Sequence, residues 1–146
     1  MKYTINHISS GEEELILNYI EENEEVARVL NFMRRESRKL IGYKDKEQVI
    51  ISPEDILYIE TVDNRTYVYT VAEVYKVNYT LLQLEALLGE KKFFRCSKSM
   101  IMNISKVVSL KSLSSNRIDA VMQGGEHIMI SRTYASDFRR RLRGEL

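Results

Sequence analysis

Basic, amide and hydroxyl side chains gather in three short polar segments of this chain. The segments are Asn64-Arg65-Thr66, Arg95 with Ser97-Lys98-Ser99, and Ser131-Arg132. Arginine and lysine displace counterions from phosphates, and serine hydroxyls bind phosphate oxygens. An arginine held on rigid backbone can also donate two hydrogen bonds to guanine. Any one of these segments alone is typical of a solvated turn, but three together indicate that the chain binds a nucleic acid.

The charge distribution agrees with this interpretation. Residues 1–27 contain seven glutamates and one lysine, whereas residues 91–146 contain twelve basic and four acidic residues, although the whole chain has a net charge of +1. A basic C-terminal third on a nearly neutral chain favours a polyanionic partner. From charge alone, an ordinary solvated surface explains the distribution equally well.

The motifs of common enzymes do not occur in the sequence. It has no glycine-rich phosphate loop, HExxH, CxxC or nucleophile elbow. Two histidines and one cysteine could bind a metal, or form a Cys96–His127 nucleophilic pair, only by converging from distant positions. We therefore expect no enzyme activity, cofactor, metal or small-molecule substrate. Cys96 stays a minor redox candidate because Arg95 and Lys98 flank it, and cations lower a thiol's pKa.

Length and composition limit the number of domains and the class of protein. A chain of 146 residues that is 44% apolar and 29% charged fits one domain, or one domain with a small appendage. A single cysteine cannot form an internal disulfide. The sequence shows neither a signal peptide nor a run of about 20 apolar residues. We therefore expect a cytoplasmic protein.

The first 45 residues predict a β-β-α appendage. Tyr3, Ile5, Leu15, Leu17 and Tyr19 alternate on either side of a Ser-Ser-Gly turn, which is typical of a hairpin, although a helix from residue 12 is also possible. Apolar residues at 26, 29, 30 and 33 then predict an amphipathic helix running towards residue 40, with a glycine just beyond its end.

Residues 46–146 predict a β-rich body, so that the chain is mainly β and α+β overall. The period changes to two after residue 47, and strands are expected near residues 49–51, 56–60, 66–71, 74–79, 93–95, 101–103, 107–110, 117–122 and 127–130. Thr80 to Gln83 has the capping-box pattern and starts a short helix that ends before Gly89. Tyr134, Phe138 and Leu142 lie four apart on a C-terminal helix.

From about residue 48 to residue 142, the chain resembles the LytTR DNA-binding domain of bacterial transcription regulators. The similarity lies in "SPEDILYIETVDNRTYVYT", "LLQLEALLGEKKFFRCSKSMIMNISKVVSL" and "GGEHIMISRTYASDFRRRL". The resemblance implies small stacked antiparallel sheets. It also implies a homodimer whose loops enter successive major grooves of a direct-repeat promoter site.

The resemblance also implies roles for individual residues. Base contacts fall on Asn64-Arg65-Thr66, Lys98-Ser99 and Arg132, while Arg95, Ser97 and Ser131 become phosphate or supporting contacts. The usual "HRS"-like triplet reads Ser97-Lys98-Ser99 here. Lysine keeps the positive charge at that position but lacks the two-pronged guanidinium. We therefore expect phosphate contact at Lys98 and leave open whether it also contacts a base.

The N-terminal part departs from many relatives, which have a receiver domain with a phosphoacceptor aspartate. Residues 1–44 contain no aspartate, so we expect a stand-alone regulator without phosphorelay control. Its appendage could mediate dimerisation, bind a co-encoded small membrane protein as inhibitor, or extend the core. The alternative function is a protein-interaction module that binds a membrane or cytosolic partner without contacting DNA.

Overall fold

The protein forms two compact units. The structure is a computed structural model that describes residues 1–37 and 39–144, and its contacts group Met1–Arg38 and Lys39–Leu146. The division lies ahead of the expected boundary at residues 45 and 46. Strand β1 (Leu40–Lys44) belongs to the second unit because it pairs with both β2 (Glu47–Ile51) and β5 (Val74–Val77).

Helix α1 (Glu24–Ser37) confirms the predicted amphipathic helix of the first unit. Asn23 caps it: its side-chain oxygen accepts a hydrogen bond from the Val26 amide at 2.9 Å. Two glutamates in the first turn favour the positive end of the helix dipole. The helix ends before the glycine expected to cap it, because Gly42 lies within β1. A Cβ there would come within 2.6 Å of Ile51 and 2.8 Å of Tyr75, so this strand position requires glycine.

The predicted hairpin of residues 3–19 is wrong. The chain bends at Ser9-Ser10-Gly11, but residues 1–23 contain neither a strand nor a helix. Nearly all of their side chains are exposed, although Tyr3 donates a 2.6 Å hydrogen bond to Glu25 at the start of α1. An isolated two-stranded hairpin is marginal in water, because alternation alone supplies no surface on which to bury its apolar face.

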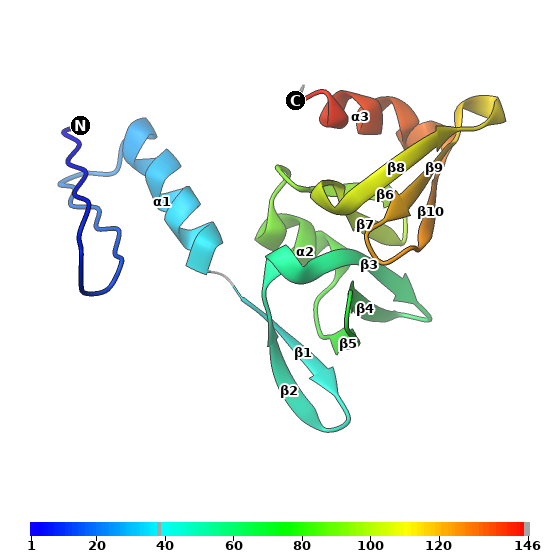
Figure 1. Cartoon of the computed structure of the whole chain (residues 1–146), viewed down its shortest axis with the longest axis horizontal. Helices are drawn as coiled ribbons and strands as arrows, with labels where there is room; N and C mark the ends of the chain where they lie inside the picture. Colours follow the sequence, from blue (N-terminus) through cyan, green and yellow to red (C-terminus); the bar gives the residue numbers. More distant parts are fainter. Residues whose placement is uncertain (38, 145–146) are drawn as a thin grey trace. The chain divides into compact units, whose positions relative to one another are not determined.

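The second unit contains a seven-stranded antiparallel sheet, in the order β2-β1-β5-β4-β3-β7-β6 (Figure 1). Its remaining strands are β3 (Ile56–Val62), β4 (Arg65–Thr70), β6 (Phe93–Ser97) and β7 (Met100–Asn103). The bend expected at Pro53 is the short 3-10 helix η1 (Pro53–Asp55) between β2 and β3. Helix α2 (Leu81–Leu88) has the predicted capping box between Thr80 and Gln83.

A three-stranded antiparallel sheet and the last helix complete this unit. The sheet has the order β10-β9-β8, formed by β8 (Val107–Ser112), β9 (Ile118–Met122) and β10 (His127–Ile130). Helix α3 (Arg132–Leu142) follows β10 directly and lies along the small sheet in Figure 1. The 3-10 helices η2 (Ile104–Lys106) and η3 (Ser114–Asn116) flank β8. Two antiparallel sheets and short helices confirm the predicted fold class.

Two hydrophobic cores hold the second unit together. One lies among the small sheet, α3 and strands β3, β6 and β7, and it contains Phe94 and Phe138. The other contains residues of α2 and of the large sheet, including Leu84 and Phe93. Phe93 and Phe94 are both buried, but they enter different cores because successive residues of a strand face opposite sides.

Buried Asn103 links the large sheet to the chain that leads into the small one. Its amide nitrogen donates to the Ile56 carbonyl at 2.8 Å, and its amide oxygen accepts from the Ser105 hydroxyl at 2.6 Å.

None of the helices in residues 1–37 and 39–144 has the length and apolar character needed to cross a membrane.

Candidate nucleic-acid interface

A tight two-residue turn joins β3 and β4 and projects one of the predicted binding segments. Val62 pairs with Arg65, and the intervening Asp63 and Asn64 have positive φ values of 51° and 60°, as in a type I′ turn. Asn64 and Arg65 are exposed. Thr66 is buried instead, with its hydroxyl 3.2 Å from that of Thr61. Thr66 therefore helps to hold the turn in place, and little of its side chain is open to a ligand.

The second segment forms the turn between β6 and β7. Ser97 pairs with Met100, which leaves Lys98 and Ser99 at the tip. The Ser99 amide donates to the Ser97 hydroxyl at 3.2 Å, so the serine organises the turn locally. The Lys98 side chain is exposed at the tip, where its ammonium group can reach an anion.

Arg95 stabilises this turn by hydrogen bonds to its backbone carbonyls. Its Nε donates to the Ser97 carbonyl at 2.8 Å, and its Nη2 donates to the Lys98 carbonyl. Its Nη1 lies 3.0 Å from a carboxylate oxygen of Glu85 on α2. The guanidinium thus joins helix and turn. With these contacts made, few of the N–H donors of Arg95 are left for a phosphate.

The structure brings these two turns together. The Thr61 amide at the end of β3 donates to the Ser99 carbonyl at 2.8 Å, across a gap of 38 positions in the sequence. Both turns line one open groove of about 700 Å³, here named the basic groove. Its described lining includes four basic residues and no acidic one. The basic residues are Arg65, Lys76, Arg95 and Lys98.

Lys76 and Asn78 also line the basic groove, although the sequence patterns did not identify them as binding residues. Lys76 lies on β5 opposite Tyr67 of β4, and Thr66 is opposite Val77. Strand register therefore places the end of β5 beside the β3–β4 turn. Alternation identified β5 as a strand, but only the register shows that its lysine shares a groove with Arg65.

Ser131 and Arg132 lie on a different part of the unit. They follow β10 of the small sheet and begin α3, and both are exposed. The backbone amides of Tyr134 and Ala135 both donate to the Ser131 carbonyl at 3.0 Å, which fixes the start of the helix. The structure thus unites two of the three predicted segments in one groove and leaves the third as a separate basic corner.

Several charges of the basic C-terminal third are already engaged. Arg139 donates to the Asn116 side chain at 2.7 Å, and Arg140 pairs with Asp137 in the same helix. Arg141 donates to the Glu90 carbonyl and lies 5.6 Å from the centre of the Phe94 ring. These guanidinium groups keep their charge, but fewer of their N–H donors are available to a ligand on α3 than the number of arginines suggests.

Cys96 and His127 form no nucleophilic pair. Cys96 is fully buried, its thiol donates weakly to the Met100 carbonyl at 3.6 Å, and burial raises its pKa to about 12. His127 is exposed, with its Nδ1 3.0 Å from the Asp119 carboxylate. Within residues 1–37 and 39–144, no group of three or more metal-binding side chains is arranged around a common point.

Native Cys96 is expected to resist iodoacetamide at pH 8, because a buried, protonated thiol is a poor nucleophile. Burial raises the thiol's folded-state pKa from its ordinary 9.0 to about 12. Its stabilising contribution is therefore present below pH 9 and lost as the pH rises from about 9 to 12. Mass spectrometry of labelled native and urea-unfolded protein checks this. Labelling of the native thiol as rapid as that of the unfolded protein would contradict it.

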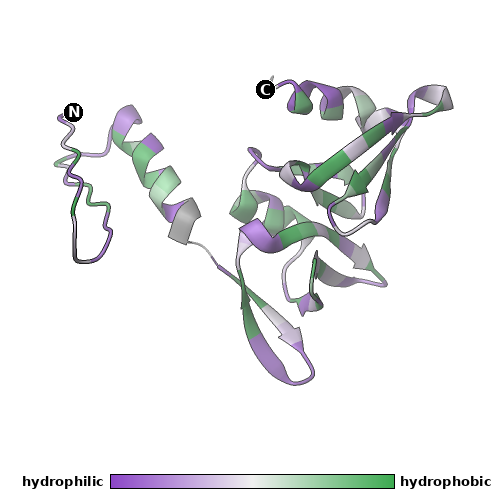
Figure 2. Ribbon diagram, viewed as in Figure 1, coloured by the Kyte–Doolittle hydropathy of each residue, from purple (hydrophilic) through white to green (hydrophobic). Residues whose placement is uncertain are grey.

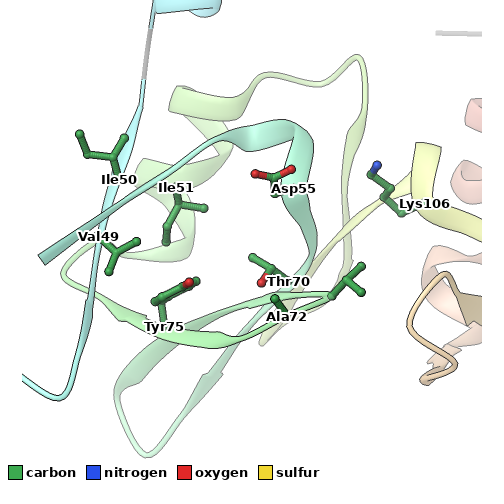
Figure 3. Close-up of a pocket in the computed structure, with 9 residues that line it drawn as sticks. Val49, Ile50, Ile51, Asp55, Thr70, Ala72, Tyr75 and Lys106 are labelled. Atoms are coloured by element: carbon green, nitrogen blue, oxygen red, sulfur yellow. The ribbon is translucent and has the colours of Figure 1, made fainter. Parts of the chain in front are cut away.

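A second pocket of about 270 Å³ lies beside β2 and the β4–β5 turn (Figure 3). Its walls include the aliphatic residues Val49 and Ile51, with Asp55 and Lys106 contributed by different elements. It contains none of the predicted binding residues. The basic groove is therefore the better candidate for an anionic ligand.

Comparison with known proteins identifies the family. The LytTr DNA-binding domain family matches residues 46–143. Sensory transduction protein LytT of Bacillus anthracis is 32% identical over 108 residues, which cover 74% of this chain and 44% of that protein. Transcriptional regulatory protein YpdB of Escherichia coli (strain K12) is 28% identical over 107 residues, which cover 72% of this chain and 43% of that protein. The chain thus spans less than half the length of these curated relatives.

A solved structure agrees with the sequence match. It is the LytTr DNA-binding domain of a protein described as a methyl-accepting/DNA response regulator from Bacillus cereus. It superposes with a TM-score of 0.68 at 26% identity, over 71% of this chain and 95% of that one. The family consists of DNA-binding domains rather than enzymes, in line with the expectation from the motifs. On the sequence match over two thirds of its length and this shared fold, the chain belongs to the LytTr DNA-binding domain family.

Proposed function

We propose that the protein is a transcription regulator that binds duplex DNA in a sequence-specific manner through its basic groove. The observation on which this depends is the Thr61–Ser99 hydrogen bond, which sets the β3–β4 and β6–β7 turns side by side. Two adjacent turns with exposed Asn64, Arg65 and Lys98 form a basic projection. A projection of this kind can enter a major groove and contact base edges.

Individual roles follow from exposure and hydrogen bonding. Asn64 has an exposed amide that can donate to and accept from adenine, and Arg65 can donate twice to guanine. Lys98 supplies a phosphate contact at the tip of its turn, and Lys76 adds charge from β5. Buried Thr66 and engaged Arg95 position these groups and do not themselves touch DNA.

Ser131 and Arg132 supply a second contact. They begin α3, where the helix amino end and a serine hydroxyl favour a phosphate oxygen, and Arg132 projects into solvent. Because they lie at the start of α3 and outside the basic groove, they suit a neighbouring groove of the same duplex. Two copies on a direct repeat would engage four such grooves and gain affinity by linkage.

Regulation is assigned to the first unit. We propose that this unit controls assembly on DNA, and that a co-encoded small membrane protein restrains the regulator in the cytoplasm. The family resemblance supports this partner, and a pull-down from detergent-solubilised membranes tests it.

Lys98→Ala and Arg132→Ala are each expected to weaken binding to the protein's own promoter region. Loss of a phosphate contact at Lys98 lowers affinity for all sequences and reduces the salt slope of binding by about one. Loss of a bidentate contact at Arg132 costs about 1–3 kcal/mol and relaxes specificity at one position. Gel shifts or fluorescence anisotropy at several salt concentrations measure both effects.

Lys111→Ala is the matched control, because it removes the same charge from the exposed face of β8 outside the basic groove. It should leave affinity nearly unchanged. Unchanged binding in both test variants would refute the residue assignments. Absence of any salt-sensitive binding by the unaltered protein would refute the function.

A further inference from the structure

The first unit exposes an unusual set of large apolar side chains. Its members are each more than half exposed, and Ile5 and Ile20 reach 95% and 99%. We call them the N-terminal apolar set. The set consists of Tyr3, Ile5, Leu15, Ile16, Ile20 and Phe32. Apolar and polar stretches alternate along this part of the chain in Figure 2. Soluble monomers seldom leave so many large apolar side chains in water.

This unit lacks the usual means by which so short a segment holds its fold. Of the side chains described in it, only that of Val26 is buried. Units below about 40 residues generally need a disulfide, a metal or an oligomeric partner. The chain's single cysteine is Cys96 in the other unit, and the described residues contain no metal-binding cluster. Association with another polypeptide can supply this stability.

The charge pattern along α1 identifies that polypeptide. Four glutamates occur within residues 21–25, and the sequence from 34 to 39 contains four basic residues and one glutamate. Two α1 helices packed antiparallel place the acidic start of each against the basic end of the other. A second copy of this chain is therefore complementary to the first in charge, and it offers the same exposed apolar side chains for contact.

We propose that residues 1–37 form the interface between two copies of this chain, with the α1 helices antiparallel and the N-terminal apolar set buried between them. In the pair, the alternating apolar side chains of residues 3–8 and 15–20 pack against the other copy, which supplies the apolar surface that a single copy lacks. The biological role of this interface rests on the proposed function, because a pair of copies places two DNA-binding units on a repeated site. The interface itself forms without DNA.

Sedimentation and light scattering of the full chain test the interface directly. The unaltered protein is expected at twice its monomer mass of 17.1 kDa. The double variant Ile5→Asp, Ile20→Asp should associate roughly 100-fold more weakly or worse, because two apolar contacts become buried charges. These positions are nearly fully exposed in one copy, so the monomer keeps its structure. Ile50→Asp, at a 65% exposed position of β2, is the control that should stay paired.

A charge-swap experiment tests the antiparallel arrangement. One variant has Glu21→Lys, Glu22→Lys and Glu24→Lys, which makes both ends of α1 basic; the other has Arg34→Glu and Arg35→Glu, which makes both ends acidic. Each variant alone is expected to be monomeric, and an equimolar mixture should recover the paired mass. Recovery supports the proposal, while pairing of either variant alone to the level of the unaltered protein overturns it.

Two further outcomes would also overturn the interface. One is an unaltered protein that stays monomeric at about 100 µM, which would assign the apolar set to a different partner. The other is a fully paired Ile5→Asp, Ile20→Asp variant. A single-repeat DNA probe separates this inference from the proposed function. Monomeric variants should keep their single-site affinity and lose only the tighter binding to two repeats, whereas failure of the proposed function removes single-site binding as well.

Discussion

Phe138→Ala is expected to lower the free energy of unfolding of the second unit by about 3–5 kcal/mol, the usual cost of deleting a buried aromatic ring. Phe138 is fully buried, its ring centre is 5.7 Å from that of Phe94, and it packs against both sheets from α3. Because a domain of this size is stable by about 5–15 kcal/mol, this loss removes much of its stability. The chain has no tryptophan, so urea unfolding followed by circular dichroism is the suitable measurement.

Two companion variants make this prediction specific. Phe138→Leu fills most of the same space. It should lower the free energy of unfolding by less than about 1.5 kcal/mol, apart from the further loss of the contact with the Phe94 ring. Leu142→Ala removes an apolar side chain one turn further along α3 that is 39% exposed, and it should cost well under half as much as Phe138→Ala. If Phe138→Ala cost less than 1 kcal/mol, the core between α3 and the sheets would not exist as described. Loosening of α3 should also displace Arg132 and weaken DNA binding.

Arg95→Ala is expected to reduce DNA affinity by about 10- to 100-fold, although Arg95 is not expected to touch DNA. The substitution removes the bonds to the Ser97 and Lys98 carbonyls and leaves Glu85 without its guanidinium partner. Hydrogen bonds from charged groups contribute about 1.5–3 kcal/mol each when well shielded, and less at this partly exposed site. The β6–β7 turn should then sample several conformations, only some of which present Lys98 to the duplex.

Arg95→Lys separates positioning from charge. Lysine keeps the positive charge but cannot donate to two carbonyls and a carboxylate in one plane, so most of the loss should persist. In the double variant Arg95→Ala, Lys98→Ala, the second substitution should have little further effect, since the first already misplaces Lys98. Full additivity, or full recovery of affinity by lysine, would show that Arg95 contacts phosphate directly. Glu85→Gln should give a smaller loss in the same direction.

Local pattern predicted most of the second unit. Strand alternation, the Thr80 capping box and the apolar face of the last helix located most of its elements to within a few residues, because these signals depend on near neighbours in the sequence. Strand β1 was missed, since residues up to 40 were assigned to the preceding helix and Gly42 to its end. The Asp63-Asn64 turn was predictable for the same reason: both residues tolerate positive φ. The hairpin of residues 3–19 failed because alternation describes what a strand can bury and does not supply the partner that it needs.

For the candidate site, too, the sequence identified the residue types and the tertiary structure decided their arrangement. Residue types alone identified Asn64, Arg65, Lys98 and Arg132 as groups that could bind DNA, and the family match supports that chemistry. The tertiary structure decided which of them lie close together: antiparallel register and the Thr61–Ser99 hydrogen bond join two turns and add Lys76, while Arg132 begins α3 outside this groove. It also turned Arg95 inward and buried Thr66. Contacts between distant residues depend on strand register and packing, and neither is encoded in the local spacing of the sequence.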